Sequence, residues 1–371
     1  DFSDKEINKY YPNEYILNHY FFHPTTFNYN KLRELKKISE LSNLDKLKLR
    51  INFYISLIFF ICKKPYFRLF DNSYYKNNFE KIIRKKYEYV FVSHLNNKDQ
   101  LCSKNDQYFG DLPEILSKKN KRVLLLLIPH CKIKENDFLN LKRNINSYDI
   151  YILSNNFLQE NNVFEEVTRV IKERRRLLKT SKNNSHSKLK RNLYHYAGEK
   201  LFSKDNQNTL LQAKQVSRII SKSRPKNIIT TYEGHNWERL FYFFAKKGYK
   251  KIKCLGYQHT LIFEKNHSVK RELKSLYNPD YILTSGILSS KIMKKSFSKD
   301  IKVNVLGSTK FNKKNKTADL LNIHEAIIFL PSGEEEEAVF FTNFALNFAK
   351  TNRSYRVIIR YHPVIRDKFK K

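Results

Sequence analysis

The stretch NIITTYEGHNWERLFYFFAKKGYKKIKCLGYQHT, residues 227–260, decides the fold class. It opens with a short apolar run at 227–231 that leads into Glu233-Gly234, continues with a helical segment, and returns to an apolar run at 251–255. Two apolar runs separated by a helix are typical of parallel strands joined by a crossover. The sequence therefore predicts an α/β protein with a parallel sheet.

The same alternation continues outward from this stretch in both directions. A long basic helical region separates the third apolar run from the fourth, from about Phe164 to Ser223, and we expect the polar stretch Ser181–Ser187 to break it. Short apolar runs bounded by polar residues are typical of buried strands. The nine predicted strands lie at 87–92, 123–128, 149–153, 227–231, 251–255, 281–284, 303–306, 326–330 and 355–360.

Nine strands exceed the needs of one small Rossmann unit, so we expect two Rossmann-like domains facing each other across a cleft. A helical segment at 1–80 precedes a first domain at 81–270, which carries the long basic helical insertion. The polar stretch 265–278 is interpreted as the crossover to a second domain at 271–371. The second domain has only four predicted strands before Lys371, and we expect it to be incomplete.

The composition excludes several classes of protein. The chain has 371 residues, 41% of them hydrophobic and 14% aromatic, which excludes a disordered chain. Its four cysteines are scattered and form no CxxC pair. This pattern disfavours a disulfide scaffold and a zinc ribbon, and it favours a reducing compartment.

The charge balance leaves several interpretations open. The formal net charge is +35, from 71 basic and 36 acidic residues. Such an excess is typical of proteins that bind nucleic acid or an anionic membrane surface. A coding bias towards Lys, Asn, Ile, Tyr and Phe explains it as well. A nucleic-acid partner is disfavoured, because lysines occur along the whole chain and the aromatic residues lie mostly in apolar segments.

The longest apolar run is INFYISLIFFIC, from Ile51 to Cys62, and Lys63 and Lys64 follow it. Twelve helical residues span roughly 18 Å, which is short of the ~30 Å hydrocarbon core of a bilayer. We favour a buried core helix. The alternative is a helix that dips into a membrane surface, with its lysines facing anionic lipid.

Four histidines follow apolar runs, and in open α/β sheets ligands bind beyond the carboxyl ends of the strands. A structural histidine bonded to backbone is the alternative for each one taken alone. Together they predict a polar cleft, with His130 among the residues that contact substrate. The four are His94, His130, His259 and His362.

Glu233 and His259 lie at the ends of two strands that we expect to be neighbours. A carboxylate placed in this way can act as general base for a sugar hydroxyl, and the alternative is that Glu233 caps a neighbouring helix. We predict catalytic roles for both residues and substrate contacts for the adjoining Gly234 and Gln258. Trp237, the only tryptophan, is expected to pack in the core.

The C-terminal segment LPSGEEEE, residues 330–337, places a loop before a helix. Ser332 and Gly333 would present backbone N–H groups to an anion at the helix N-terminus. We interpret Glu334 and Glu335 as a solvated first turn that suits the helix dipole. One of Glu336 and Glu337 could instead accept a hydrogen bond from a ribose hydroxyl, and we place Glu336 among the substrate-binding residues.

The last predicted strand ends in RYHP, residues 360–363. Arg360 and His362 are two residues apart and point the same way by strand alternation. Both can donate to a phosphate, and Pro363 would stiffen the turn that follows.

Several familiar motifs are absent from the sequence. It has no Walker loop, GxGxxG, HExxH or GxSxG, and no DxD pair stands at a strand end. The sequence thus offers no nucleophile elbow for a hydrolase triad. The absence of a DxD pair argues against metal-dependent nucleotide-sugar chemistry. We expect no metal and no bound cofactor.

The succession of Glu-Gly, Trp-Glu, GYQH, LGS, LPSG and RYHP between 227 and 363 resembles bacterial surface-carbohydrate biosynthesis proteins of GT-B architecture. The segment YFGDLPEIL, Tyr108–Leu116, extends this similarity into the first domain. Related GT-B enzymes, the sialyl-, polysialyl- and Kdo transferases, use CMP-activated sugars. In them an acidic-acidic-Gly motif holds the general base, and His-Pro binds the nucleotide phosphate.

Glu233-Gly234 is similar to the first of these motifs and His362-Pro363 to the second. Tyr232 stands where the family often has a second acid, and a Ser-rich motif expected after His-Pro would lie beyond Lys371. His-Pro also occurs in polyol-phosphate transferases, so the resemblance leaves the donor open.

The resemblance implies a metal-independent glycosyltransferase of surface polysaccharide synthesis, with the donor in the C-terminal domain and the acceptor in the N-terminal domain. Its partners would be a nucleotide-sugar donor, with CMP-sugar favoured, and a polysaccharide or lipid-linked acceptor. The expected location is cytoplasmic, peripheral on the inner face of the plasma membrane. The alternatives are a polyol-phosphate transferase of the same fold, a nucleic-acid-binding protein and a non-catalytic scaffold.

Overall fold

A computed structural model describes most of the chain in two compact units. The described residues are 37–69, 73–103, 105–131, 133, 147–153, 163–201, 204–262, 268–308, 326–331, 335–361 and 369. The chain divides between Asn312 and Lys313, and each unit is described by itself.

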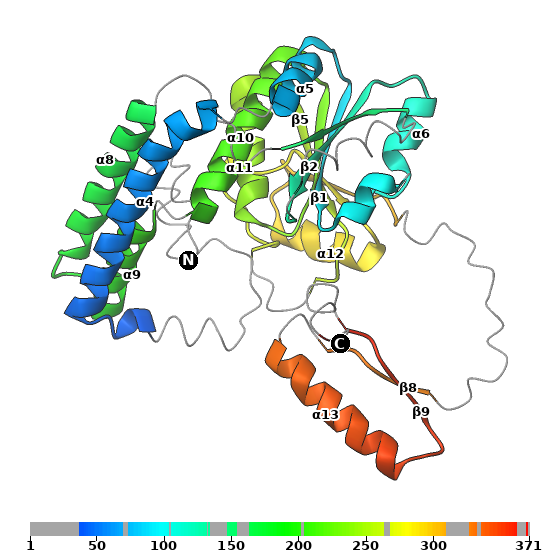
Figure 1. Ribbon diagram of the computed structural model, residues 1–371. Coiled ribbons are helices and arrows are strands. Elements are labelled where there is room, and N and C mark those ends of the chain that lie inside the picture. Colours follow the sequence, from blue (N-terminus) through cyan, green and yellow to red (C-terminus); the bar gives the residue numbers. More distant parts are fainter. Residues whose placement is uncertain are drawn as a thin grey trace. The chain divides into compact units, whose positions relative to one another are not determined.

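The first unit is built on a seven-stranded sheet in which every neighbouring pair of strands is parallel (Figure 1). The chain runs outward from β1 through β2 and β3, and then returns to add β4 to β7 on the other side of β1. This order is that of a doubly wound, Rossmann-like sheet, so the predicted α/β class is confirmed. Across the sheet the strands are β3 (Asp149–Ile152), β2 (Val123–Pro129), β1 (Tyr89–Leu95), β4 (Asn227–Thr231), β5 (Lys253–Gln258), β6 (Tyr281–Thr284) and β7 (Lys302–Val305).

The central strands are apolar because both of their faces are covered. In β1 and β2 the side chains alternate between two hydrophobic clusters, with Val90 and Leu124 in one and Phe91 and Leu125 in the other. All four are nearly inaccessible to solvent. This two-sided burial is what a parallel sheet with helices on both faces requires.

Helices cover the sheet and extend beside it. The helices α10 and α11 pack against each other, and α6 packs beside β2. The helices α4, α8 and α9 form a bundle (Figure 1). The α-helices of this unit whose bounds are described are α4 (Asn43–Leu69), α5 (Ser73–Arg84), α6 (Leu112–Lys118), α8 (Val163–Ser181), α9 (Lys188–Lys200), α10 (Lys204–Ser223), α11 (Asn236–Gly248) and α12 (Ile287–Ser296).

The second unit contains a parallel β-α-β arrangement. Its strands β8 (Ala326–Phe329) and β9 (Arg356–Ile359) pair in parallel, and α13 (Glu335–Thr351) lies between them in sequence. Phe329 contacts the aromatic rings of Phe341, Phe344 and Phe348 from α13.

All nine predicted strands are present, with ends displaced by up to three residues. The predicted break at Ser181–Ser187 separates α8 from α9. The strands could be found because short apolar runs bounded by polar residues are the strongest sequence signal of a buried parallel sheet.

The predicted domain boundary at 270/271 is wrong. The strands β6 and β7 continue the first sheet beyond β5, and the polar stretch taken as a crossover is fixed to α11 by the buried Arg239. This guanidinium donates to Oδ1 of Asn278 at 2.8 Å and to the carbonyl of Arg271 at 2.6 Å. The stretch supplies backbone carbonyls and the side chain of Asn278 as acceptors to a buried charge, so it is part of the first unit.

The predicted helical segment at 1–80 is also part of this unit where it is described. Residues 1–36 lie outside the described residues, and α4 and α5 follow them. Phe79 and Ile82 of α5 belong to the same hydrophobic cluster as the sheet residue Val90.

The apolar run Ile51–Cys62 lies within α4 and is only partly buried. Phe53 and Leu57 are buried, whereas Ile51, Ile58 and Phe59 are exposed. The expectation of a buried core helix therefore holds for the side that carries Phe53 and Leu57 and not for the exposed side. Within the described ranges, no helix is both long and apolar enough to cross a membrane.

Candidate active site

The polar side chains gather where the strand order reverses. The strands β1 and β4 are neighbours in the sheet, although β2 and β3 lie between them in sequence. In doubly wound sheets, ligands bind beyond the carboxyl ends of the strands at such a reversal of strand order. His94 lies near the end of β1 and Thr231 is the last residue of β4, so the sheet itself brings these side chains to one edge.

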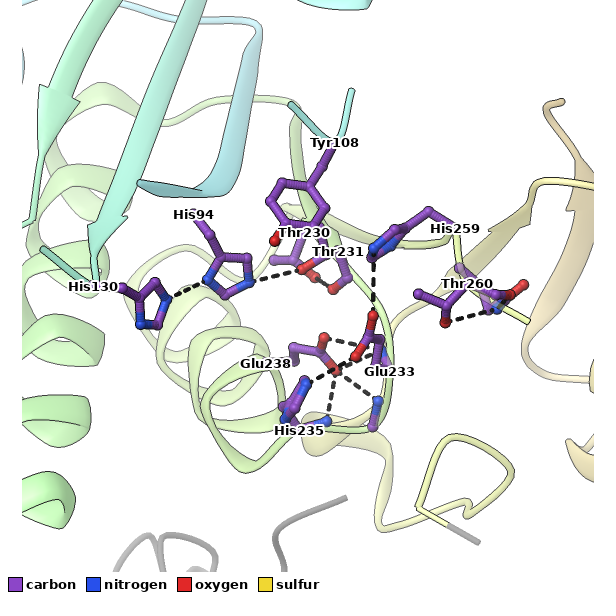
Figure 2. Close-up of polar contacts among 12 residues, drawn as sticks. His94, Tyr108, His130, Thr230, Thr231, Glu233, His235, Glu238, His259 and Thr260 are labelled. Atoms are coloured by element: carbon purple, nitrogen blue, oxygen red, sulfur yellow. Dashed lines mark hydrogen bonds and ion pairs between the residues drawn. The ribbon is translucent and has the colours of Figure 1, made fainter. Parts of the chain in front are cut away.

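The turn between β4 and α11 is organised around the buried carboxylate of Glu238 (Figure 2). This carboxylate accepts hydrogen bonds from the backbone N–H groups of Glu233 at 3.0 Å, Gly234 at 2.8 Å and His235 at 2.9 Å. Burial raises the pKa of Glu238 to about 7, while its backbone donors oppose that rise. Glu238 thus fixes the backbone from which Glu233 and His235 project.

Gly234 is the position at which this turn requires glycine. Its φ of +81° lies in the left-handed region, and a Cβ atom there would come within 2.3 Å of the backbone of Ser268. Any other residue would face both the backbone strain and the clash.

Glu233 is held between two histidines. Nε2 of His235 lies 3.1 Å from Oε2 of Glu233, and Nε2 of His259 lies 3.4 Å from Oε1 (Figure 2). Burial alone would raise the pKa of Glu233, but the hydrogen bond from His235 and the charges of His235 and His259 lower it overall. The carboxylate is therefore ionised at neutral pH and remains one-third exposed.

A second histidine pair lies beside Glu233. Nδ1 of His94 is 2.8 Å from Nε2 of His130, so one ring donates to the other, and Nε2 of His94 is 3.4 Å from the hydroxyl of Thr231 (Figure 2). Burial, followed by the charges of His130 and His235, lowers the pKa of His94 to about 3. His94 is thus neutral at physiological pH and can donate or accept a hydrogen bond.

Aromatic rings surround these polar groups. The ring of Tyr108 meets that of His259 edge-on at 5.0 Å between centroids and lies 5.3 Å from His94. Trp237 lies 5.0 Å from His94 and also packs against the core. The expected packing role of Trp237 is present, and its ring lies beside the polar cluster as well.

The arrangement is suited to proton transfer. An ionised, accessible carboxylate can accept a proton from a hydroxyl group, and two imidazoles at 3.1 Å and 3.4 Å can stabilise the charge or relay the proton. Burial alone would lower the pKa of His235, but the hydrogen bond with Glu233 and the charges of Glu238 and Glu233 raise it overall. Within the described ranges, no group of three His, Cys, Asp or Glu side chains is placed to hold a metal ion.

Three of the predicted site residues come together in this cluster: Glu233, His259 and His130 (Figure 2). Two other predicted site residues, Gly234 and Gln258, are buried and form hydrogen bonds within the protein. Gly234 is buried and its N–H is taken by Glu238. Gln258 is fully buried and its side-chain amide donates to the carbonyl of Thr260, so the structure favours a supporting role for both in place of substrate contact.

The remaining predicted residues belong to the second unit. Glu336 lies exposed in the first turn of α13, and Arg360 lies exposed just after β9, with its N–H donating to the carbonyl of Phe329 at 3.0 Å. The other four, Ser332, Gly333, His362 and Pro363, lie outside the described residues.

Sequence reasoning assigned no site role to His235, Glu238 or Tyr108. His235 and Glu238 stand in the quoted stretch EGHNWE, and the signal was a glutamate three residues after the start of a helix, a spacing that lets its carboxylate bond the turn's N–H groups. Tyr108 lies in the segment YFGDLPEIL, whose turn is fixed by the N–H groups of Tyr108 and Phe109 donating to Asp106.

Comparison with known proteins finds only distant structural similarity. No model of a protein family and no curated protein matches the chain. Among solved structures, UDP-N-acetylglucosamine 2-epimerase from Rickettsia bellii is 11% identical over 77% of this chain, with a TM-score of 0.39. UDP-GlcNAc 2-epimerase from Neisseria meningitidis, bound to UDP-GlcNAc, is 12% identical over 75%, with a TM-score of 0.37. The matches span 65% and 66% of those two chains, just under two thirds of each.

Proposed function

We propose that this protein is a glycosyltransferase that moves a sugar from a nucleotide-activated donor to a growing surface polysaccharide or a lipid-linked acceptor. The observation that carries the proposal is the ionised, one-third exposed carboxylate of Glu233 at the switch point of a doubly wound sheet. The switch point is where this type of sheet binds its ligands, and sugar transfer needs a base at the acceptor hydroxyl.

Glu233 would act as that base. As the hydroxyl oxygen of the acceptor attacks the anomeric carbon of the donor, its proton passes to the carboxylate and the bond to the nucleotide phosphate breaks. His259 and His235 would stabilise the carboxylate before the transfer. The neutral His94–His130 pair would hold hydroxyl groups of the acceptor by hydrogen bonds.

The second unit would bind the donor, for which we favour a CMP-sugar. In this proposal Arg360, His362 and the N–H groups of Ser332 and Gly333 stabilise the negative charge of the departing nucleotide, and Glu336 accepts a hydrogen bond from its ribose. The reaction would take place on the cytoplasmic side of the plasma membrane, where lipid-linked acceptors are reached from the surface.

The change Glu233→Gln tests the base. It keeps the shape of the side chain and one acceptor oxygen but removes its affinity for a proton. We expect turnover with the best donor to fall ~100-fold or more, while the affinity for the nucleotide stays within about twofold of the wild type. Nucleotide release from CMP-, CDP-, UDP- and GDP-linked donors measures the first quantity, and calorimetry with the free nucleotides measures the second.

A matched control is His186→Gln, which alters a histidine outside this cluster that is stacked on Tyr194. It should leave both quantities unchanged. Full activity of Glu233→Gln would exclude Glu233 as the base and make His259 the next candidate. If nucleotide is released from a CDP-polyol but from no nucleotide-sugar, the transferred group is a polyol phosphate and not a sugar. Binding of no nucleotide at all would remove the proposed function.

A further inference from the structure

A strongly basic pocket lies in the helical bundle, away from the histidine cluster described above. Its volume is about 440 Å³, and it opens between α4, α8 and α9. None of its described lining residues is acidic. The lining residues are Lys46, Arg50, Leu178, Ser181, Lys182, Lys188, Arg191, Asn192 and His195.

Among the described residues, little negative charge compensates the positive charges of this pocket. Arg50 comes within 3.8 Å of a carboxylate oxygen of Glu199, but that carboxylate is already bound by Arg174 at 2.8 Å. In the part of the chain that the structure describes, the other four cations form no ion pair: Lys46, Lys182, Lys188 and Arg191.

His195 supports the same conclusion. Its Nε2 atom is buried and has no hydrogen-bond partner among the described residues. Burial, followed by the charges of Lys46 and Arg50, lowers its pKa to about 4. A concave site with clustered cations is suited to an anionic oxygen group such as a phosphate. The charge of such a group would favour the protonated form of His195, in which Nε2 becomes a donor.

The helix that supplies Lys46 and Arg50 also exposes a continuous apolar face. Its members recur every three or four residues, so they share one side of the helix, next to the side that buries Phe53 and Leu57. Among them Ile58 is 58% and Phe59 is 69% exposed. The exposed apolar residues of α4 are Leu44, Leu47, Ile51, Tyr54, Ile55, Ile58, Phe59 and Ile61.

We propose that α4 and the basic pocket dock this protein on an anionic lipid bilayer, with the pocket receiving a lipid phosphate headgroup and the apolar face of α4 entering the headgroup boundary. A basic cluster next to an exposed apolar helix face matches the two layers of a membrane surface. This surface gives the proposed location a physical basis and does not depend on the transfer reaction.

The charge and the arrangement favour a bilayer over two other occupants. A second copy of the chain would bring another +35 charge to the same place, and like charges repel. A soluble phosphate would fill the pocket but leave some 18 residues of apolar helix face, roughly 25 Å in length, against water.

Vesicle sedimentation with the full chain tests the proposal. We expect the protein to bind vesicles of phosphatidylcholine with 30% phosphatidylglycerol and to remain unbound with pure phosphatidylcholine. The double variant Arg50→Gln/Arg191→Gln should bind roughly 10- to 30-fold more weakly, because each basic residue near an anionic leaflet contributes about 1 kcal/mol. Ile58→Ser/Phe59→Ser should lose a similar amount.

Matched controls show whether vesicle binding depends on this surface or on the charge and hydrophobicity of the protein in general. Lys250→Gln/Lys251→Gln removes the same charge from the exposed turn between α11 and β5, and Leu261→Ser/Leu288→Ser removes exposed apolar side chains elsewhere. Each should change binding less than threefold. Phe59→Trp should show quenched emission on vesicles with brominated acyl chains, which reports insertion of α4.

Three outcomes would overturn the proposal. The first is equal binding of the wild type to neutral and anionic vesicles, or equal loss in the variants and their controls. The second is a thermal shift with inorganic phosphate but no vesicle binding, which would indicate a soluble anion. The third is a lowered Tm in Ile58→Ser/Phe59→Ser, which would show that another part of the chain covers the face of α4. A wild type that is dimeric beside a variant that is monomeric would show that a second copy covers it. All three readouts are independent of sugar transfer.

Discussion

At the scale of single residues, the two glutamates of the site have different pKa values because their surroundings differ. Glu233 has a lowered pKa because His235 and His259 face it, whereas Glu238, five residues along, has a raised pKa because it is fully buried. Pairs of groups that are pushed apart in this way are common where protons are transferred. The consequence is that one carboxylate is available to substrate while the other serves the backbone.

His94 gives a prediction on pH. Its folded-state pKa of about 3 lies below the ordinary value of 6.5, so the folded protein resists protonation of this ring. The stability that it contributes is complete above pH 6.5 and is lost as the pH falls from 6.5 towards 3. We expect the Tm of the wild type to fall more between pH 7.5 and pH 5 than that of His94→Gln.

Thermal unfolding monitored by circular dichroism measures both slopes. His186→Gln is the control and should keep the slope of the wild type, because His186 lies outside this cluster, stacked on Tyr194. Parallel slopes for His94→Gln and the wild type would contradict the assignment of a neutral, buried His94.

The sequence could predict some of these residues and not others. His94, His130, Glu233 and His259 were predicted because parallel strands bring their carboxyl ends to one edge. The contact of His235 with Glu233 could not be predicted, since it depends on the backbone path through Gly234. That path is set by a φ of +81° and by the close approach of Ser268, which is distant in sequence.

At the scale of elements, the turn from β4 to α11 is the part on which the site depends. One carboxylate accepts hydrogen bonds from three backbone N–H groups there. The next residue, Arg239, donates to the carbonyls of Ser268 and Arg271, in the stretch that approaches Gly234 closely. The start of α11 thus fixes Glu233 from two directions. The expected position of this turn came from the sequence, whereas the contacts of Arg239 that help to fix it span 29 or more residues.

Glu238→Ala tests this turn. The change leaves three N–H groups of a buried turn without their acceptor, at about 1–3 kcal/mol for each unsatisfied group. We expect the free energy of unfolding to fall by about 3 kcal/mol or more at pH 5.5, as measured by urea denaturation. Glu238→Gln keeps one acceptor oxygen and should fall between Glu238→Ala and the wild type.

Glu114→Ala is a matched control, because Glu114 is also in the first turn of a helix but pairs with Lys118 at the surface. It should lose no more than about 1 kcal/mol. An equal loss in Glu238→Ala and Glu114→Ala would show that the buried carboxylate does not hold the turn. Because the pKa of Glu238 is raised to about 7, its contribution should weaken as the pH rises from 4.5 through 7, and Glu238→Gln should lack this dependence.

At the scale of the whole molecule, the strands could be predicted while the division of the chain could not. Each strand is a local apolar run, so its position is written in adjacent residues. The division depends on which strands pair, and the polar stretch before β6 has the composition of a linker although Tyr277 and Asn278 within it are buried. Placing the boundary after β7 leaves Glu233 and its histidines in the first unit and Arg360 in the second.

This division predicts that variants of the second unit will affect nucleotide binding, whereas a variant of Glu233 will affect turnover. If the second unit binds the donor, Arg360→Ala and His362→Ala should each weaken nucleotide binding by roughly 1.5–3 kcal/mol, the usual contribution of a charged hydrogen bond. Glu233→Gln should instead leave binding intact and lower turnover. Arg356→Ala, an exposed arginine of β9, is the matched control and should alter neither. Calorimetry with the nucleotide, beside a turnover assay at saturating donor, distinguishes the two classes.

If Arg360→Ala and His362→Ala bind nucleotide as the wild type does, the donor site lies elsewhere. If Glu233→Gln also keeps its turnover, the transfer chemistry assigned to the switch point is wrong, and the sheet and its histidine cluster must serve another ligand.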